Sequence, residues 1–148
     1  MTQILKDFLI GAKNKEFAIK NGTKAHSALR CLVVDNNHGD SEFVSIIQNR
    51  PDLVSFFGVN AKTEVPIAGF VNGHFISRRI DRLLINDDTK TIDFIDYKTD
   101  TDKTTFVEQY KHQLKEYLEL LKSAYPKYKI NGYILWLTDW DLNKIVHN

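Results

Sequence analysis

Apolar residues recur at helical spacing near the start of the chain, between about Glu16 and Val34. This pattern predicts a helix that breaks or starts at Asn21 and Gly22, two residues that are unfavourable inside helices. His26 falls on the predicted helix.

Two further short helices are predicted between residues 41 and 57. Ser41 is suited to cap the first, over residues 42–50, because its hydroxyl can accept a hydrogen bond from a free backbone amide. Pro51 ends this helix and starts the next one, which runs through Phe57. Both helices are expected to serve packing.

The middle of the chain is rich in β-branched and aromatic residues, a composition typical of strands. Residues 62–70 and 74–85 form two such runs, and the turn signal VNG at residues 71–73 predicts a β-hairpin between them. A polar turn at residues 86–90 leads to TIDFIDYK, residues 91–98, where apolar and polar residues alternate. Three consecutive strands are therefore predicted.

A long helix and a last strand complete the predicted fold. Thr104 or Thr105 can cap a helix with one apolar stripe, and YPK at residues 125–127 ends it. The stripe consists of Val107, Tyr110, Leu114, Tyr117, Leu118 and Leu121. Residues 130–138 are almost continuously apolar, the pattern of a strand covered on both faces. The predicted order is helices followed by β-β-β-α-β, an α/β fold whose central mixed sheet is flanked by helices.

Composition limits the possible functions. With 148 residues, 43% of them hydrophobic and 26% charged, the chain fits one globular domain over residues 1–148. A net charge of +1 gives no overall basic field, so DNA binding would depend on local patches. The single cysteine, Cys31, excludes an internal disulfide, a multi-cysteine zinc site and a cysteine-ligated iron-sulfur cluster. No segment resembles a secretory signal or a membrane span, so we expect a cytoplasmic protein without membrane contact.

Two aspartates lie in predicted strands among residues that favour burial. Asp81 follows Ile80 in the second strand, and Asp96 lies in the third. A buried carboxylate is costly unless it is paired, hydrogen-bonded or bound to a metal. Because a short turn joins these strands, the two carboxylates can approach each other, and a hard divalent cation would relieve their repulsion. Lys98 leaves its strand on the same face as Asp96.

Such a set of residues would suit metal-assisted hydrolysis. The carboxylates would hold an ion that polarises a phosphoryl oxygen and acidifies a water, and the Lys98 ammonium would orient that water or stabilise developing charge. A plain structural explanation exists for each residue, since D-x-K is common in exposed strands and Asp81 could pair with Arg79 or Arg82. The order and spacing of the set favour the functional interpretation.

Four motifs in order resemble the RecB-type nuclease domain of the PD-(D/E)XK superfamily and, more closely, the C-terminal nuclease domain of AddA-type helicase-nucleases. That family has G-x-x-x-H on an upstream helix, an aspartate in an I-D-R/L strand, a D-x-K strand and a Q-x-x-x-Y helix. Here the motifs read GTKAH, IDRL, DYK and QLKEY. The matching residues are His26, Asp81, Asp96, Lys98, Gln113 and Tyr117. The resemblance spans roughly residues 20–138.

This resemblance implies a restriction-endonuclease-like core and a metal site. Asp81, Asp96 and the backbone carbonyl of Tyr97 correspond to ligands of Mg²⁺ or Mn²⁺, and His26 corresponds to an additional ligand. Without the motif, His26 reads as a histidine on a helix surface. Glu64 aligns with an acidic position often seen on the first strand and is a candidate for supporting the site.

The motif pair Gln113 and Tyr117 shares one helix face, because the residues are four positions apart. One interpretation places Tyr117 in the core with Gln113 at its edge. The resemblance instead places both beside the site, where they would orient Lys98 or contact DNA. Both interpretations stay open from the sequence.

The implied activity is that of a metal-dependent deoxyribonuclease, an exonuclease acting in double-strand break repair and recombination. Its substrate would be single-stranded or unwound DNA ends, supplied by a helicase subunit or domain. The chain has no GxxxxGK[ST] motif for ATP, so it would be the nuclease part of a larger protein, a separate subunit or a stand-alone enzyme. The alternative is a non-catalytic DNA-binding or interaction domain of a repair complex that keeps the nuclease fold.

Three arginines lie close to Asp81 in the second predicted strand and could bind phosphate. They are Arg78, Arg79 and Arg82. Strand alternation places Arg78 and Arg82 on one face and Arg79 on the other. Arg78 also departs from the family pattern, which often has glycine at that position.

Overall fold

The computed structural model describes residues 26–30, 32–34 and 42–148. Residues 26–29 form a helical turn. The later elements are α2 (Glu42–Gln48), α3 (Pro51–Val54), the 3₁₀ helix η1 (Ser55–Phe57), β1 (Lys62–Val71), β2 (His74–Asn86), β3 (Thr91–Lys98), α4 (Val107–Ala124), β4 (Lys129–Trp136) and β5 (Asp141–His147).

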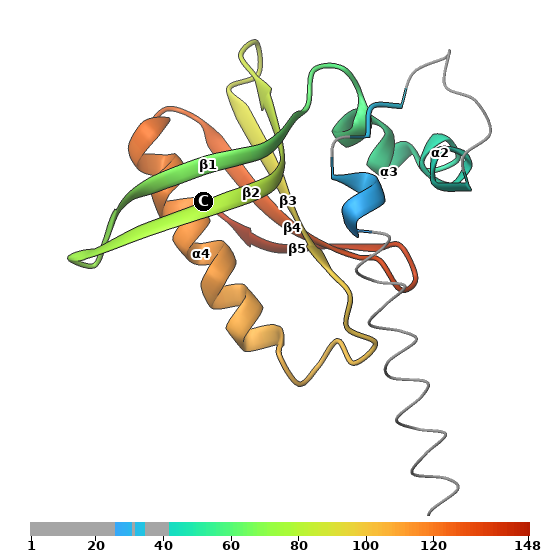
Figure 1. The fold of residues 1–148 in the computed structure, drawn as a ribbon. Helices are drawn as coiled ribbons and strands as arrows, with labels where there is room; N and C mark the ends of the chain where they lie inside the picture. The colour runs from blue at the N-terminus through green and yellow to red at the C-terminus, as the bar shows by residue number, and fades with distance from the viewer. Residues whose placement is uncertain (1–25, 31, 35–41) are drawn as a thin grey trace, which may run out of the picture.

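Five strands form one mixed sheet in the order β1-β2-β3-β4-β5, as Figure 1 shows. Strands β3 and β4 run parallel and are connected through α4, whereas the other neighbouring strands are antiparallel. A two-residue turn joins β1 to β2. Its residues Asn72 and Gly73 both have positive φ, 51° and 78°, which matches the turn to the twist of the hairpin.

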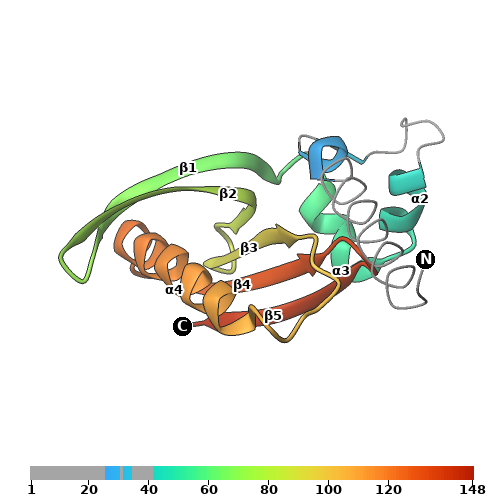
Figure 2. The same ribbon diagram turned by 60° about the horizontal axis from the view of Figure 1, so that its bottom comes forward.

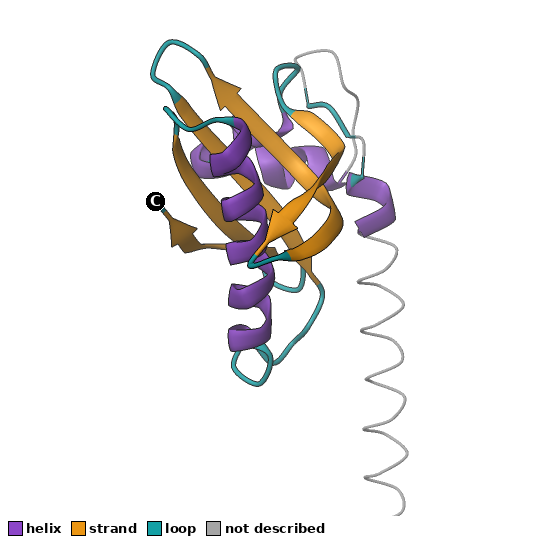
Figure 3. Ribbon diagram, turned by 90° about the vertical axis from the view of Figure 1, so that its left-hand side faces the viewer, coloured by secondary structure: helices purple, strands orange, loops and turns teal. Residues whose placement is uncertain are grey.

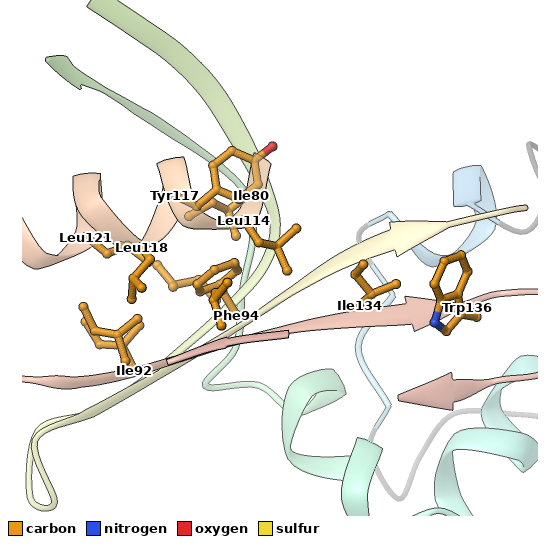
Figure 4. Packing of buried hydrophobic residues seen from close by; sticks show 12 residues of the cluster. Ile80, Ile92, Phe94, Leu114, Tyr117, Leu118, Leu121, Ile134 and Trp136 are labelled. Atoms are coloured by element: carbon orange, nitrogen blue, oxygen red, sulfur yellow. The ribbon is translucent and has the colours of Figure 1, made fainter. Parts of the chain in front are cut away.

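Helices cover both faces of the sheet (Figure 2 and Figure 3). On one face, α4 packs against even-numbered residues of β3 and β4 (Figure 4). The contacts involve Leu114, Tyr117, Leu118 and Leu121 of α4 with Ile92, Phe94, Ile130 and Ile134 of the strands. Burying each such aliphatic or aromatic side chain contributes roughly 1.5–3 kcal/mol. Trp136, at the end of β4, is buried in this cluster.

The opposite face carries a second hydrophobic core, formed by the segments that precede the sheet. Leu29, Ile47 and Phe57 pack there against Ile95 and Tyr97 of β3. Residues of β3 therefore alternate between two cores, so both faces of this strand are covered. The two ionisable residues at its end, Asp96 and Lys98, point toward the α4 side, where Lys98 meets Gln113 of α4.

The β1–β2 hairpin bends away from the sheet at Glu64. Strand β2 pairs with β3 only from Arg82 onward, and its earlier residues pair only with β1. The β1–β2 ladder is interrupted at Glu64, which has a φ of 52°, in the left-handed region that is costly for a side chain other than glycine. The first half of β2 thereby projects past the sheet as an arm, visible in Figure 1.

Arg82 is fully buried beneath this bend, on the side of the second core. Its guanidinium donates to the backbone carbonyls of Leu29, Leu32 and Phe56 at 2.5–3.0 Å and to the Tyr97 hydroxyl at 2.7 Å. It also lies over the Phe57 ring, 3.9 Å from the centroid. The prediction that Arg82 could bind phosphate is therefore wrong, because no solvent reaches it.

The predicted faces of the arginines are also wrong. Arg78 lies 3.5 Å from Glu116 on α4, whereas Arg82 contacts the opposite layer. Alternation along a regular strand would put Arg78 and Arg82 on one face. The β1–β2 pairing is interrupted at Glu64, so the residues of β2 before and after this point do not follow one continuous alternation.

Most predicted elements are confirmed, including the hairpin, the polar turn at residues 86–90, the helix start at Pro51, the end of α4 and the β4 strand. The helix predicted through Val34 is too long, because residues 32–34 are not helical and the Val34 amide donates to the Phe57 carbonyl. Residues 16–25 and Ser41 lie outside the described residues.

Two other details differ from the prediction. Neither Thr104 nor Thr105 caps α4, whose N-cap is Phe106 without a side-chain hydrogen bond. Both threonine amides instead donate to Asp102, which closes a turn before the helix. Strand β5 was not predicted at all. No helix in the described part of the chain is long and apolar enough to cross a membrane.

We predict that Arg82→Leu lowers the free energy of unfolding by about 3 kcal/mol or more, because three buried carbonyls lose their donor. Urea denaturation followed by circular dichroism measures this change. Arg79→Leu is the matched control, since that side chain is 57% exposed and its ion pair with Glu64 is 3.7 Å long. The control should change stability by less than about 0.5 kcal/mol. Equal urea midpoints for the two variants would contradict the structural role of Arg82.

Candidate active site

The pairing of β2 with β3 brings the two predicted carboxylates together. The last paired residues are Arg82 and Ile95, and one step further in the same register Asp81 lies opposite Asp96. At that step the backbone pairing gives way to a side-chain contact, in which the Tyr97 amide donates to Asp81 Oδ2 at 2.8 Å. Both aspartates are buried, with 9% and 5% of their surfaces exposed.

Burial and repulsion dominate the electrostatics of Asp81. Its pKa is raised to about 6, first by loss of solvent and then by the negative charge of Asp96, with a smaller contribution from Glu64. The Tyr97 amide and His26, whose Nε2 lies 3.5 Å from Asp81 Oδ1, act in the opposite direction. Two carboxylates held this close form a site that favours an added positive charge.

Asp96 has one oxygen without a hydrogen bond. Its Oδ2 lies 2.6 Å from Lys98 Nζ, yet it is buried and accepts no hydrogen bond from the described residues. The short distance marks an ion pair, so Lys98 balances the charge of this carboxylate in the structure.

The Lys98 ammonium is held on several sides by α4. It donates to Gln113 Oε1 at 3.0 Å, and Gln113 Nε2 donates in turn to the Tyr117 hydroxyl at 2.9 Å. Tyr117 also belongs to the core, with its ring 5.9 Å from that of Phe94. Tyr117 is therefore a core residue, as the first interpretation predicted, and its hydroxyl contacts Gln113, which in turn contacts Lys98.

Tyr110, predicted only as part of the apolar stripe, also contacts Lys98. Lys98 Nζ lies 4.2 Å from the centroid of its ring, within the range of cation–π attraction. The Tyr110 hydroxyl donates to Asp100 Oδ2 at 2.5 Å, which fixes the ring. The spacing of three residues between Tyr110 and Gln113 is the signal that could have placed both on one helix face.

His26 reaches the site from the helical turn at residues 26–29. Besides its approach to Asp81, its ring contacts the edge of Tyr97, with centroids 5.2 Å apart. The Tyr97 side chain points into the second core, where burial raises the pKa of its hydroxyl. Its amide faces Asp81, and in an extended strand the carbonyl of a residue points to the same edge as its amide.

Glu64 lies beside the site without joining its hydrogen-bond network. It faces Asp81 across the interrupted β1–β2 ladder. Two arginines flank its carboxylate, Arg30 at 3.4 Å and Arg79 at 3.7 Å. Its charge raises the pKa of Asp81, so it adds to the negative potential around the two aspartates.

A cavity of about 310 Å³ opens beside these residues. It is lined by His26, Tyr97, Lys98, Thr99, Asp100 and Tyr110. The Lys98 ammonium and the His26 ring thus border a space large enough for part of a substrate.

The oxygens of this site fit a hard divalent cation. Asp81 and Asp96 supply two carboxylates, Tyr97 supplies a carbonyl at the same edge, and Asp96 Oδ2 has no hydrogen bond. Among residues 26–30, 32–34 and 42–148 no group of three or more histidine, cysteine or acidic side chains is arranged to hold a metal. Any cation here would therefore depend on the backbone carbonyl and on water as well as on the two aspartates.

The chain was compared with protein-family models, with curated proteins and with solved structures, and none of them matches it. The family resemblance consequently depends on the motif residues and on their arrangement in space.

We predict that Asp81→Asn raises the melting temperature of the metal-free protein at about pH 8. Because the pKa of Asp81 is higher in the folded protein than in the unfolded chain, the ionised carboxylate destabilises the fold above about pH 6. That cost, about 1–3 kcal/mol, disappears as the pH falls below about 4, where both states are protonated.

Thermal unfolding in chelator at about pH 8 and pH 4 measures the difference. Asp93→Asn is the control, because Asp93 lies on the same strand as Asp96 but bonds to Asn131 outside the site. A lower melting temperature for Asp81→Asn than for wild type at pH 8 would refute the assigned repulsion.

Proposed function

We propose that this protein is a metal-dependent DNA nuclease of the RecB type within the PD-(D/E)XK superfamily. The observation that carries the proposal is the proximity of described residues from the four motifs. His26 contacts Asp81, and Asp81 accepts a hydrogen bond from the Tyr97 amide next to Asp96. Lys98 contacts both Asp96 and Gln113. Residues from a helical turn, two strands and a second helix thus lie beside one another, which is the arrangement that the motif order predicts.

The arrangement of elements supports a restriction-endonuclease-like core. A β-hairpin, a third antiparallel strand, a crossover helix and a parallel fourth strand follow one another along the chain. The acidic residues lie where β2 parts from β3, and the Gln113–Tyr117 helix face packs over them. This is the arrangement that the motif order implies for a nuclease of this superfamily.

The metal would be held by Asp81, Asp96 and the Tyr97 carbonyl. His26 contacts Asp81 but does not form a preformed group with both aspartates, so it would become an additional ligand only when the ion binds. A bound Mg²⁺ or Mn²⁺ ion would polarise the scissile phosphate and lower the pKa of a water. Imidazole is a softer ligand than carboxylate, so participation of His26 favours Mn²⁺ over Mg²⁺.

Lys98 would be the catalytic cation of the site. Its ammonium can orient the attacking water or stabilise the charge that develops on the phosphoryl oxygens. Gln113 and the ring of Tyr110 limit its position, and Tyr117 fixes the Gln113 amide. Such preorganisation lowers the cost of arranging the ammonium at the moment of reaction.

The substrate and partner follow from the family resemblance. We propose single-stranded or unwound DNA ends as substrate, a helicase subunit or domain as partner, and end processing at double-strand breaks as the setting. The net charge of +1 means that such DNA must be bound through local groups around the site.

The activity is tested with end-labelled DNA and Mg²⁺ or Mn²⁺. We expect wild type to release labelled fragments, and Lys98→Ala and Asp96→Ala to reduce the rate by about 100-fold or more, because each removes a charge that acts on the reacting phosphate. Lys127→Ala, which removes an exposed lysine outside the site, should retain wild-type activity. A wild-type rate of cleavage in Lys98→Ala or Asp96→Ala would contradict the proposed mechanism.

Metal binding separates the nuclease from the non-catalytic alternative. Titration calorimetry should detect Mn²⁺ binding to wild type, and Asp81→Asn and Asp96→Asn should each weaken it by about tenfold or more, since each removes one charged ligand. Asp93→Asn should bind Mn²⁺ as wild type does. A folded wild-type protein that binds no Mn²⁺ would favour a non-catalytic DNA-binding or interaction domain.

A further inference from the structure

The arm formed by the β1–β2 hairpin has no role in the network described above. From Ile80 back to the turn, β2 pairs only with β1, and the two strands arch over α4 (Figure 1 and Figure 2). The approach to the helix is close at Gly69, where a Cβ would lie 2.8 Å from Leu120 Cδ2. The arm therefore rests on α4 at its middle and leaves its tip free.

Two phenylalanines are exposed at this tip. Phe70 and Phe75 pair across the strands with 75% and 64% of their surfaces exposed, and their rings meet edge to face at 5.5 Å. Leaving two large apolar side chains in water is unfavourable, so their exposure suggests a ligand. In the described part of the chain, the other large exposed hydrophobic residues lie elsewhere, at Val54, Val59 and Phe106.

Phe70 also lines a groove of about 720 Å³ between the tip and α4. The helix side contributes apolar Leu118 and charged residues that include Lys115, Glu119 and Lys122. Lys122 is 3.8 Å from Glu119, whereas Lys115 has no ion-pair partner among the described residues. The groove lies on the α4 side of the arm and its lysines are accompanied by Glu116 and Glu119.

The rings of Phe70 and Phe75 project from the opposite face, because Gly69 faces Leu120 and neighbouring strand residues alternate. We infer that a single-stranded segment of DNA binds across the tip of the arm, with bases stacked on Phe70 and Phe75 on the face turned away from α4. The inference rests on the proposed function, which supplies the DNA. Base stacking on aromatic side chains tolerates any sequence, and basic residues follow the backbone. Both features suit an enzyme that processes DNA ends irrespective of sequence.

The arm also connects the aromatic pair with the candidate active site. Strand β2 runs from Phe75 to Asp81, a span of about 20 Å at roughly 3.3 Å per residue. Arg78 and Arg79 lie along this path and are exposed. Arg79 shares the face of Phe75, whereas Arg78 points to Glu116 on α4. A strand anchored at the tip would therefore pass Arg79 before it reached the carboxylates.

The local surface fits DNA better than a protein partner. A stable protein interface needs an apolar centre within roughly 1,200 Å² or more of buried surface. Here two rings stand among charged residues, and the remaining exposed apolar side chains of the described chain lie on other elements. Isolated aromatic rings beside cations are sufficient for bases and phosphates.

The test measures binding of a fluorescein-labelled oligothymidine to the whole chain in chelator, which prevents cleavage. The Phe70→Ala, Phe75→Ala double variant should bind at least about tenfold more weakly than wild type. The Phe70→Tyr, Phe75→Tyr variant should bind within about threefold of wild type, because it keeps aromatic faces. The Phe70→Leu, Phe75→Leu variant should be as weak as the alanine variant, since it keeps only apolar bulk.

Two controls accompany these variants. Val59→Ala changes an exposed apolar residue outside the arm and should bind as wild type does. Sedimentation of each protein shows whether the rings join two copies of the chain instead. Wild-type affinity in the alanine or leucine variant would overturn the inference, as would a dimer that dissociates when the rings are removed.

A small chromogenic phosphodiester, bis(p-nitrophenyl) phosphate with Mn²⁺, separates this inference from the proposed function. The ester can reach the carboxylates without touching the arm, so every arm variant should hydrolyse it at the wild-type rate. If wild type hydrolyses the ester and the alanine variant still binds DNA normally, only the stacking site is wrong. If wild type hydrolyses nothing while the variants lose DNA binding, the nuclease is wrong and the DNA site stands.

Discussion

The structure depends on an interlock between two short sequences, IDR on β2 and DYK on β3. The Tyr97 amide donates to Asp81, and the adjacent Arg82 donates back to the Tyr97 hydroxyl. Neighbouring residues of β2 thus bind the backbone and the side chain of one residue on β3. Arg82 extends this connection to three backbone carbonyls in the preceding segments. A buried cation is tolerated here because each of its three nitrogens donates to an acceptor, and it fixes the helical turn that carries His26.

The bend at Glu64 lies opposite Asp81 and sets the direction in which the β1–β2 hairpin leaves the sheet. A left-handed residue inside a strand costs of order 1–3 kcal/mol, which persists only where surrounding contacts impose it. Here Arg30 and Arg79 hold the Glu64 carboxylate, and Arg82 anchors the partner strand beneath. At the bend Asp81 has no regular strand partner, and its carboxylate accepts a hydrogen bond from the Tyr97 amide. The same departure from the sheet directs the hairpin over α4.

Sequence patterns were sufficient for features that depend on local chemistry. Strand β3 was predicted by its alternation, the hairpin by the Asn72–Gly73 turn, and the meeting of Asp81 with Asp96 by the short connection between their strands. Strand β5 was missed because DLNKIVH is polar at its start, and it forms by pairing with the buried β4 rather than from its own pattern. The burial of Arg82 was equally unpredictable, because its acceptors are carbonyls about 26 to 53 residues away. Contacts of that kind leave no periodic signal in a single sequence.

Lys98 balances the charge of one of the two buried aspartates. The ammonium lies 2.6 Å from Asp96 Oδ2, so one negative charge is balanced, and the raised pKa falls on Asp81. Under the proposed function, a divalent cation would take over the role of balancing Asp96. Lys98 would then keep the Gln113 oxygen and the Tyr110 ring as partners, and its charge would not be left buried and alone. The same two contacts that tolerate the lysine in the free protein would therefore hold it toward the phosphate once its aspartate is occupied.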